Sequence, residues 1–180
     1  MSDTSRIPED GIMLSAVTHV CIVVEDVDRT ARNFASKFGI GPFTIRTSHT
    51  PEERGTVGGN PAEYTLKFGY AQVGPVVLEL VQPLGGESIY TDFLRERGEG
   101  IHHIGFSPGG LLEDEIDRWK GEGIDALQTH RRDDPRYGWA YMDTETDVGC
   151  ILEVVCDPPL GWWESKSLSE DLRGPLGEDG

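Results

Sequence analysis

The chain contains an internal repeat, and this duplication restricts the folds that are open to it. Residues 18–40, THVCIVVEDVDRTARNFASKFGI, align without a gap with residues 102–124, HHIGFSPGGLLEDEIDRWKGEGI, so that His19 falls on His103. Residues 63–81 align at a smaller offset with residues 137–155, and Glu79 falls on Glu153. Because one such unit cannot bury its apolar face alone, we expect the two copies to pack against each other, either within one chain or across a dimer.

Each copy reads as a strand, a helix and three further strands. In the first copy, Asp26 is a suitable N-cap and Gly39 a suitable stop for the helix. In the second copy, Leu112, Ile116 and Trp119 recur at helical spacing. The first copy also has a longer loop at residues 47–61, rich in Gly, Pro and charged residues, which we expect to form a mobile cover.

The predicted fold class is α+β, with two βαβββ modules that form a cupped mixed sheet around a metal site. A chain of 180 residues suits one such unit. We expect a flexible N-terminus at 1–13, a first module at 14–84, a linker helix at 85–100 that begins near Ser88, a second module at 101–156 and a C-terminal tail at 157–180. In the tail, Trp162 and Trp163 are the residues expected to dock.

Four side chains at equivalent places in the copies predict a metal site. Alternate residues of a strand share a face, so His19 and the two glutamates have apolar neighbours such as Cys21 and Val77. A buried carboxylate is costly unless it is paired, and neither glutamate strand contains a basic residue. One divalent cation would balance two neutral imidazoles and two carboxylates, so we predict as metal ligands His19, Glu79, His103 and Glu153. The ion could be Co, Ni, Mn, Zn or Fe.

The remaining histidines and the cysteines are assigned structural roles. His102 precedes a predicted ligand and should point to the opposite face, with an indirect role at the metal as the alternative. His49 and His130 lie in predicted loops and are expected at the surface. The three cysteines, which lie in or beside apolar runs and do not form a C-x-x-C pair, are predicted to be reduced core residues: Cys21, Cys150 and Cys156.

The charge of the chain limits its partners. Sixteen basic and 32 acidic residues give a net charge of −16, which disfavours nucleic acid and anionic membranes as partners. No apolar run approaches the length of a membrane span. The N-terminal sequence MSDTSRIPEDG lacks the basic and apolar parts of a secretory signal, so we expect a cytoplasmic location.

The motifs LELVQPL at 78–84 and FLRERGEGIHHIGF at 93–106 extend this pattern. Over about residues 14–156 the chain resembles the vicinal oxygen chelate superfamily, and within it the methylmalonyl-CoA epimerases are most similar. The resemblance implies the same four metal ligands, a small-molecule carbonyl substrate and a homodimer. It also implies that Glu63 is a proton-transferring carboxylate. In the second copy Glu63 is matched by Tyr137, so the repeat itself does not require an acid there.

The expected activity is a metal-dependent epimerase or isomerase that moves a proton alpha to a carbonyl through a metal-stabilised enolate. Inversion needs an acid/base group on each face of the carbon, and Glu63 and Glu153 are the predicted pair. The alternatives are a cyclitol epimerase of the valiolone type, a lyase similar to glyoxalase I, and a non-catalytic binding or resistance protein. A fourth protein ligand argues against an extradiol dioxygenase, which needs open metal positions.

The substrate is expected to be an acyl-CoA or a keto-cyclitol. The epimerase family usually has a His-Pro-Lys stretch where this chain has Asp143, Thr144 and Glu145, and the loss of the lysine disfavours a CoA thioester. A local basic patch could still bind phosphate groups. Its predicted members are Arg46, Lys67, Arg131, Arg132 and Arg136.

Overall fold

The computed structural model describes residues 12, 14 and 16–157. The predictions for the N-terminus and for a tail with Trp162 and Trp163 concern residues outside this part, apart from Ile12 and Asp157. The elements are β1 (Val17–Val23), α1 (Val27–Phe38), β2 (Thr44–Thr50), β3 (Gly55–Val57), β4 (Asn60–Pro61), β5 (Tyr64–Val73), β6 (Val76–Gly86), α2 (Ile89–Arg97), β7 (Gly100–Phe106), α3 (Leu112–Gly121), β8 (Ala126–Arg131), β9 (Gly138–Met142), α4 (Glu145–Val148) and β10 (Ile151–Cys156).

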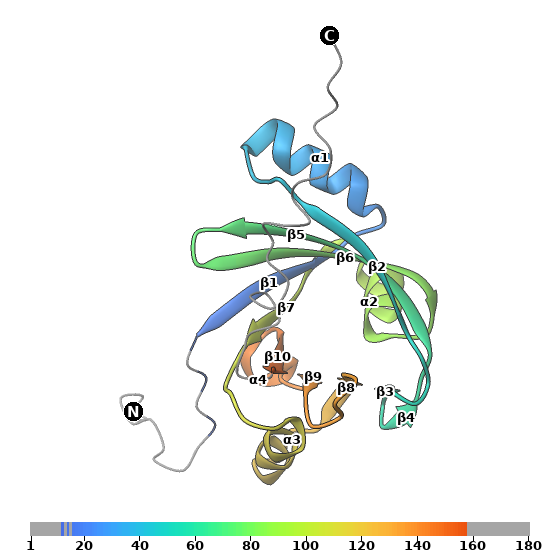
Figure 1. Cartoon of the computed structure of the whole chain (residues 1–180), viewed down its shortest axis with the longest axis vertical. Coiled ribbons are helices and arrows are strands. Elements are labelled where there is room, and N and C mark those ends of the chain that lie inside the picture. Colours follow the sequence, from blue (N-terminus) through green and yellow to red (C-terminus); the bar gives the residue numbers. More distant parts are fainter. Residues whose placement is uncertain (1–11, 13, 15, 158–180) are drawn as a thin grey trace.

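All ten strands of the described residues belong to one strongly curved sheet, in the order β2-β5-β6-β1-β7-β10-β9-β8-β3-β4 (Figure 1). At its centre β1 pairs antiparallel with β7, while β6 and β10 run parallel to them on either side. The order is therefore the same in both directions from the centre as far as β2 and β8. The predicted α+β fold with two βαβββ modules is confirmed, and the copies pair edge to edge within one chain.

The helices begin and end where their sequence signals predict. The Asp26 side chain accepts a hydrogen bond from the backbone N–H of Arg29 at the start of α1, and Gly39 ends the helix with a φ of 66°. Ser88 caps α2 in the same way by accepting from the N–H of Thr91. No helix in the described residues combines the length and apolar character that a membrane crossing needs.

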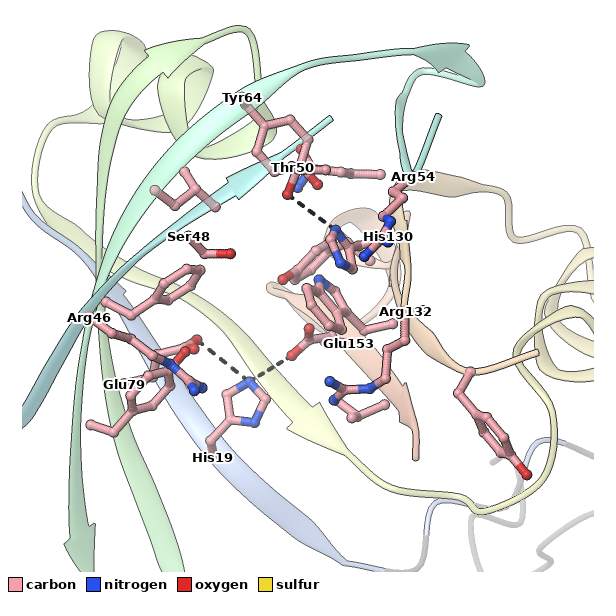
Figure 2. Close-up of a pocket in the computed structure, with 18 of the residues that line it drawn as sticks. His19, Arg46, Ser48, Thr50, Arg54, Tyr64, Glu79, His130, Arg132 and Glu153 are labelled. Atoms are coloured by element: carbon pink, nitrogen blue, oxygen red, sulfur yellow. Dashed lines mark hydrogen bonds and ion pairs between the residues drawn. The ribbon is translucent and has the colours of Figure 1, made fainter. Parts of the chain in front are cut away.

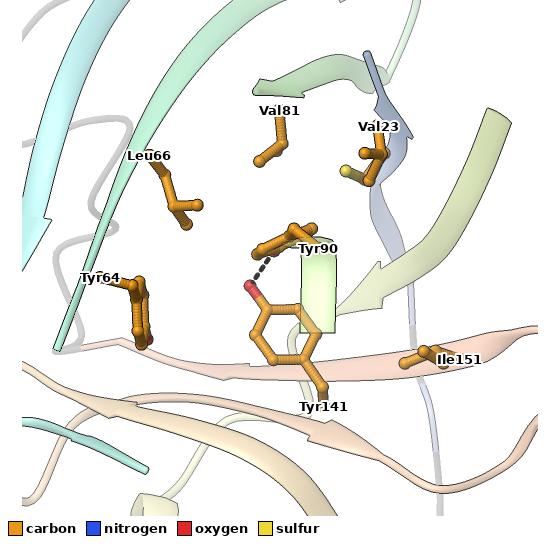
Figure 3. Packing of buried hydrophobic residues seen from close by; sticks show 8 residues of the cluster. Val23, Tyr64, Leu66, Val81, Tyr90, Tyr141 and Ile151 are labelled. Atoms are coloured by element: carbon orange, nitrogen blue, oxygen red, sulfur yellow. Dashed lines mark hydrogen bonds between the residues drawn. The ribbon is translucent and has the colours of Figure 1, made fainter. Parts of the chain in front are cut away.

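Apolar packing covers both faces of the sheet. On the outer face, α1 buries Val27 and Ala31 against β6, and α3 buries Leu112 and Trp119 against β9 and β10. On the inner face, Tyr90 of α2 is fully buried at the centre of a cluster drawn from both modules (Figure 3). Each large apolar side chain buried in this way stabilises the fold by roughly 1.5–3 kcal/mol.

Residues 47–61, predicted as a mobile cover, form the end of β2 and the β3–β4 hairpin. β3 pairs with β8 of the second module, and the N–H of Arg131 donates to the carbonyl of Arg54 over 2.8 Å. The Thr56 and Thr129 hydroxyl oxygens lie 2.7 Å apart across the same pair of strands. Since β3 follows β2 after four residues, the hairpin joins the two ends of the sheet and closes the cup.

Strand register corrects one part of the repeat alignment. Tyr70 lies opposite Glu79 in the β5–β6 pair, and Tyr141 lies opposite Glu153 in the β9–β10 pair. The glutamates are 74 positions apart but the tyrosines are 71, because α4 lengthens the connection from β9 to β10. The match of Glu63 with Tyr137, made at the offset of 74, is therefore wrong.

Candidate metal centre

The four side chains predicted as metal ligands converge at the centre of the sheet. His19, Glu79, His103 and Glu153 come from four adjacent strands, and all four are buried. The Nε2 atoms of the two histidines lie 3.0 Å apart. The Glu153 Oε2 atom lies 2.6 Å from the Nε2 of His19 and 3.2 Å from that of His103, and the Glu79 Oε2 atom lies 3.7 and 3.5 Å from them. Figure 2 shows His19 between the two carboxylates.

A β-bulge brings His102 to the same cluster. His103 lies opposite Cys21, but Ile101 lies opposite Ile22, so His102 is an additional residue on β7. Its Nδ1 atom is 2.9 Å from the Nδ1 of His103. The prediction that His102 points to the opposite face is therefore wrong, because regular alternation does not continue through a bulge.

The Nδ1 atoms of His19 and His103 contact neighbouring side chains, so the Nε2 atom of each ring points to the centre of the four predicted ligands. The Thr18 hydroxyl lies 3.0 Å from the Nδ1 of His19. Burial lowers the pKa of His102 to about 2, so this ring is neutral and has one proton. When the His103 Nδ1–H donates to the Nδ1 of His102, the His103 Nε2 lone pair faces the other ligands. The His102 proton then lies on its Nε2, a buried atom without a hydrogen-bond partner in the described residues.

The donor set fits a divalent cation. Glu153 Oε2 is buried and makes no hydrogen bond within the described residues, although His19 Nε2 is 2.6 Å away. A tetrahedral ion with bonds of about 2.0–2.2 Å separates its ligand atoms by roughly 3.3–3.6 Å, close to most distances here. Burial opposes ionisation of Glu153, but the neighbouring His19 and His103 hold its pKa well below the usual range. Two imidazoles and an ionised carboxylate thus already face one point, with Glu79 beside them.

Cys21 lies near these four side chains, but its thiol is protonated and is therefore a poor metal ligand. Its Sγ is close to donor atoms of Glu79 and His103. Burial raises the pKa of the Cys21 thiol to about 12, so the sulfur keeps its proton at neutral pH. All three cysteines are free; Cys21 and Cys156 are buried, as predicted for core residues, whereas Cys150 is only half-buried.

A pocket of about 610 Å³ opens above the centre. His19, Glu79 and Glu153 lie at its floor (Figure 2), while His103 is fully buried behind them. The first module forms one wall through β2 and β5, and the second module forms the other through β8 and β9. Alternate residues of these strands face the pocket: Arg46, Ser48, Thr50, Leu66, Phe68, Tyr70, Gln128, His130, Trp139 and Tyr141.

Two tyrosines that were not predicted as site residues lie beside the floor of the pocket. Tyr70 and Tyr141 are opposite Glu79 and Glu153 in their hairpins, so each wall presents one Glu–Tyr pair. Burial raises the pKa of both phenols well above the ordinary value, so both keep their protons. Tyr90 donates to the Tyr141 oxygen over 2.6 Å, which leaves the Tyr141 proton available to the pocket. The cross-strand position opposite a predicted ligand could have identified them.

Glu63 does not reach this pocket. Its side chain is 65% exposed, and its carboxylate lies 3.8 Å from the His49 Nε2 atom. It precedes β5 and is not among the residues that line the pocket, whereas the next residue, Tyr64, is. This placement does not meet the expectation for a proton-transferring carboxylate. His49 is exposed, as predicted.

His130 lines the pocket and is buried, so the prediction of a surface position is wrong. The loop assignment failed because β8 extends to Arg131. The His130 ring stacks on Trp139 with centroids 4.0 Å apart, and its Nδ1 lies 3.2 Å from the Thr50 hydroxyl. This contact joins β8 to β2 across the pocket (Figure 2). Burial, assisted by the nearby arginines, lowers the pKa of His130 to about 4.

We expect His130 to make stability fall as the pH drops from about 6.5 to about 4. The unfolded histidine has a pKa near 6.5, so in this range the unfolded state binds the extra proton and becomes favoured. The full loss is roughly 3 kcal/mol. Denaturant unfolding between pH 4 and 7.5 measures it, and His130→Gln should show a shallower dependence. Parallel curves for the two proteins would contradict this account.

The predicted basic residues do not form one patch. Arg46 and Arg132 line the pocket. Lys67 pairs with Asp28 of α1 and Arg131 with Glu113 of α3, both away from the pocket, whereas Arg136 pairs with Asp134, which lines it. Lys67 and Arg131 alternate along their strands with residues that face the pocket, so their side chains lie on the other face of the sheet. The positions of basic residues in the sequence do not show this separation.

Thr144 and Glu145, which stand where a His-Pro-Lys stretch was compared, make contacts within the fold. Thr144 donates to the carbonyl of Cys150 and accepts from the N–H of Leu152, which fixes the connection before β10. Glu145 pairs with Arg97 of α2. Glu145 therefore forms an ion pair between α4 and α2, whereas a lysine at this position was considered for contact with a CoA substrate.

Comparisons with known proteins agree with this architecture. Residues 18–142 match the Glyoxalase/Bleomycin resistance protein/Dioxygenase superfamily. The uncharacterized protein YqjC of Bacillus subtilis is 28% identical over 106 residues, which cover 53% of this chain and 68% of that protein. Methylmalonyl-CoA epimerase from Mycobacterium tuberculosis has a similar structure, with a TM-score of 0.59, 18% identity and coverage of 88% of this chain and 94% of that one.

Two further structures are similar. A variant of the Streptomyces coelicolor methylmalonyl-CoA epimerase, in complex with 2-nitronate-propionyl-CoA, has a TM-score of 0.60 and 20% identity, and covers 81% of this chain and 99% of that one. A hypothetical protein from Bacillus halodurans C-125 has a TM-score of 0.56 and 19% identity, with coverage of 79% and 94%. At these identities the likeness shows the fold.

Proposed function

Because the chain belongs to the Glyoxalase/Bleomycin resistance protein/Dioxygenase superfamily, we propose that it is a metal-dependent epimerase or isomerase that moves a proton alpha to a carbonyl group. The observation that carries this proposal is the convergence of two imidazoles and two carboxylates at the floor of a pocket. The epimerases among the similar structures support the reaction type.

The four converging residues would hold the ion as its ligands. A bound divalent ion would supply Lewis-acid stabilisation of negative charge at a carbonyl oxygen. The chain's own residues move the proton: Glu153, ionised and at the floor, accepts it from the carbon. Tyr70 keeps its phenolic proton and faces the pocket from the first module, whereas Glu153 belongs to the second. It can therefore donate a proton to the opposite face of the substrate carbon.

The substrate, the oligomeric state and the cellular location are predicted from the sequence. We propose a small-molecule carbonyl substrate, a homodimer and a cytoplasmic location. Acyl-CoA and keto-cyclitol compounds are both candidate substrates. The separation of the basic residues supports a smaller ligand than an acyl-CoA, because the phosphates of CoA need several cations on one face.

A binding or resistance protein without catalysis is the second candidate. The observation that favours it is that, among the described residues, the pocket lining has no further carboxylate without an ion-pair partner. Asp133 pairs with Arg54 over 2.6 Å and Asp134 pairs with Arg136 over 2.7 Å, while Glu63 lies outside. Proton transfer then depends on Glu153 and the tyrosines alone.

Exchange of substrate hydrogen in D2O tests the proposal. Purified protein is depleted of metal, reloaded separately with Co, Ni, Mn, Zn or Fe, and incubated with carbonyl compounds that include methylmalonyl-CoA, keto-cyclitols and 2-oxo acids. We expect NMR to show deuterium at the alpha carbon only with loaded protein, and chelation to stop it. Tight ligand binding that ignores metal and gives no exchange would instead establish the second candidate.

A further inference from the structure

The charges that line the pocket favour an anionic ligand once an ion is bound. Three arginines and four acids line it, which leaves one excess negative charge with neutral histidines. A divalent ion at the floor reverses this to one excess positive charge. The rest of the chain is strongly acidic, with a net charge of −16, so a positive pocket is a local feature of this site.

Arg46 provides positive charge at the floor of the pocket. It projects from β2, its guanidinium lies 4.8 Å from the centroid of the Tyr70 ring, and it donates a hydrogen bond to the Tyr70 side chain. Tyr70 in turn lies opposite Glu79 across the β5–β6 pair. Figure 2 shows the Arg46 side chain beside Glu79 and directed toward His19. An anionic group bound by Arg46 would therefore lie next to the metal centre.

The other two arginines of the lining are held by acids. Arg54 pairs with Asp133 over 2.6 Å, and Arg132 pairs with Asp157 over 2.5 Å while its guanidinium lies 5.2 Å from the Trp139 ring centroid. Both project from the part of the cup formed by β8 and the β2–β3 connection. Arg54 and Arg132 therefore form part of the pocket wall on the side of β8, whereas Arg46 lies on the side of Glu79.

We propose that Arg46 binds a carboxylate of the substrate, so that the pocket takes a small oxo acid whose carboxylate is within one or two carbons of its carbonyl group. A guanidinium matches a carboxylate with two parallel hydrogen bonds. The carbonyl part of this inference rests on the proposed function, whereas the carboxylate part rests on Arg46. A neutral keto-cyclitol has no carboxylate that could form an ion pair with the guanidinium.

The test compares 2-oxobutanoate with its methyl ester, which keeps the ketone but has no charge. Dissociation constants are measured by ligand-observed NMR with metal-depleted and metal-loaded protein. We expect the acid to bind at least about tenfold more tightly than the ester, as a charge-assisted pair at a partly exposed site allows. Arg46→Gln should reduce this preference to less than about threefold, and Arg46→Lys should restore part of it.

Arg131→Gln is the matched control, because it removes the same charge from β8 but on the outer side, where Arg131 pairs with Glu113. It should bind like the wild type. The inference is overturned when the ester binds as well as the acid, when Arg46→Gln keeps the full preference, or when neither compound binds at millimolar concentration.

Deuterium exchange distinguishes this inference from the proposed function. An Arg46-dependent preference for the acid without exchange into any compound would support the carboxylate site and remove the catalytic proposal. Metal-dependent exchange into neutral carbonyl compounds, with no acid preference, would do the reverse.

Discussion

Replacing Glu153 with glutamine is expected to lower metal affinity by more than about 100-fold and to remove alpha-proton exchange. Loss of a partner that only supports a ligand already costs 10–100-fold in affinity, and Glu153 is predicted as a ligand itself. The amide is neutral, so it neither balances the cation nor accepts a proton from the carbon. Competition with a chromophoric chelator measures the affinity, and NMR in D2O measures the exchange.

Glu115→Gln provides the matched control for this substitution. Glu115 is equally buried, but it lies on α3 and pairs with Arg118 over 2.6 Å, outside the pocket. This variant should bind metal like the wild type. Circular dichroism of both variants checks that they fold. A folded Glu153→Gln protein with an affinity within about threefold of wild type would exclude Glu153 from the metal site.

Replacing Gly105 with alanine is expected to disable the metal centre without changing any of the four predicted ligands. Gly105 lies opposite His19 on one side and opposite Glu153 on the other. A Cβ atom at this position would overlap the His19 imidazole ring. The ring must therefore move, which removes its Nε2 from the cluster. We expect at least a 100-fold loss of metal affinity, and overpacking should cost about 1–3 kcal/mol of stability.

Gly85→Ala is the control for that prediction. Gly85 also lies in a strand, at the end of β6, but a Cβ there would meet no atom within 4 Å. We expect unchanged metal affinity and stability. Chelator competition and denaturant unfolding are measured for both variants. Wild-type metal binding by Gly105→Ala would show that His19 does not hold the ion in the position described.

Much of the fold could be predicted because its signals are local or repeated. Asp26, Gly39 and Ser88 mark helix ends through hydrogen bonds and backbone angles that depend on a few neighbouring residues. The duplicated order of elements predicted two similar modules. The choice between pairing within a chain and pairing across a dimer depended on contacts between β1 and β7, which are distant in sequence.

The candidate site was predicted less completely. His19 and Glu79 could be recognised because a titratable group in an apolar strand needs a partner. Tyr70 was missed because its position depends on the pairing of β5 with β6, and Arg46 was predicted only as one member of a basic patch that does not form. Glu63 was assigned by resemblance, and its exposed side chain lies outside the pocket.

The two-module architecture and the convergence of the four side chains follow from the sequence, because both depend on a pattern repeated in two copies. The surroundings of these side chains depend on the tertiary structure. The bulge at His102, the shifted register that places Tyr141 opposite Glu153, and the closure of the cup by β3 arise from pairing between distant strands. Hydrogen bonding across strands sets register, and a change of one residue moves a side chain to the other face.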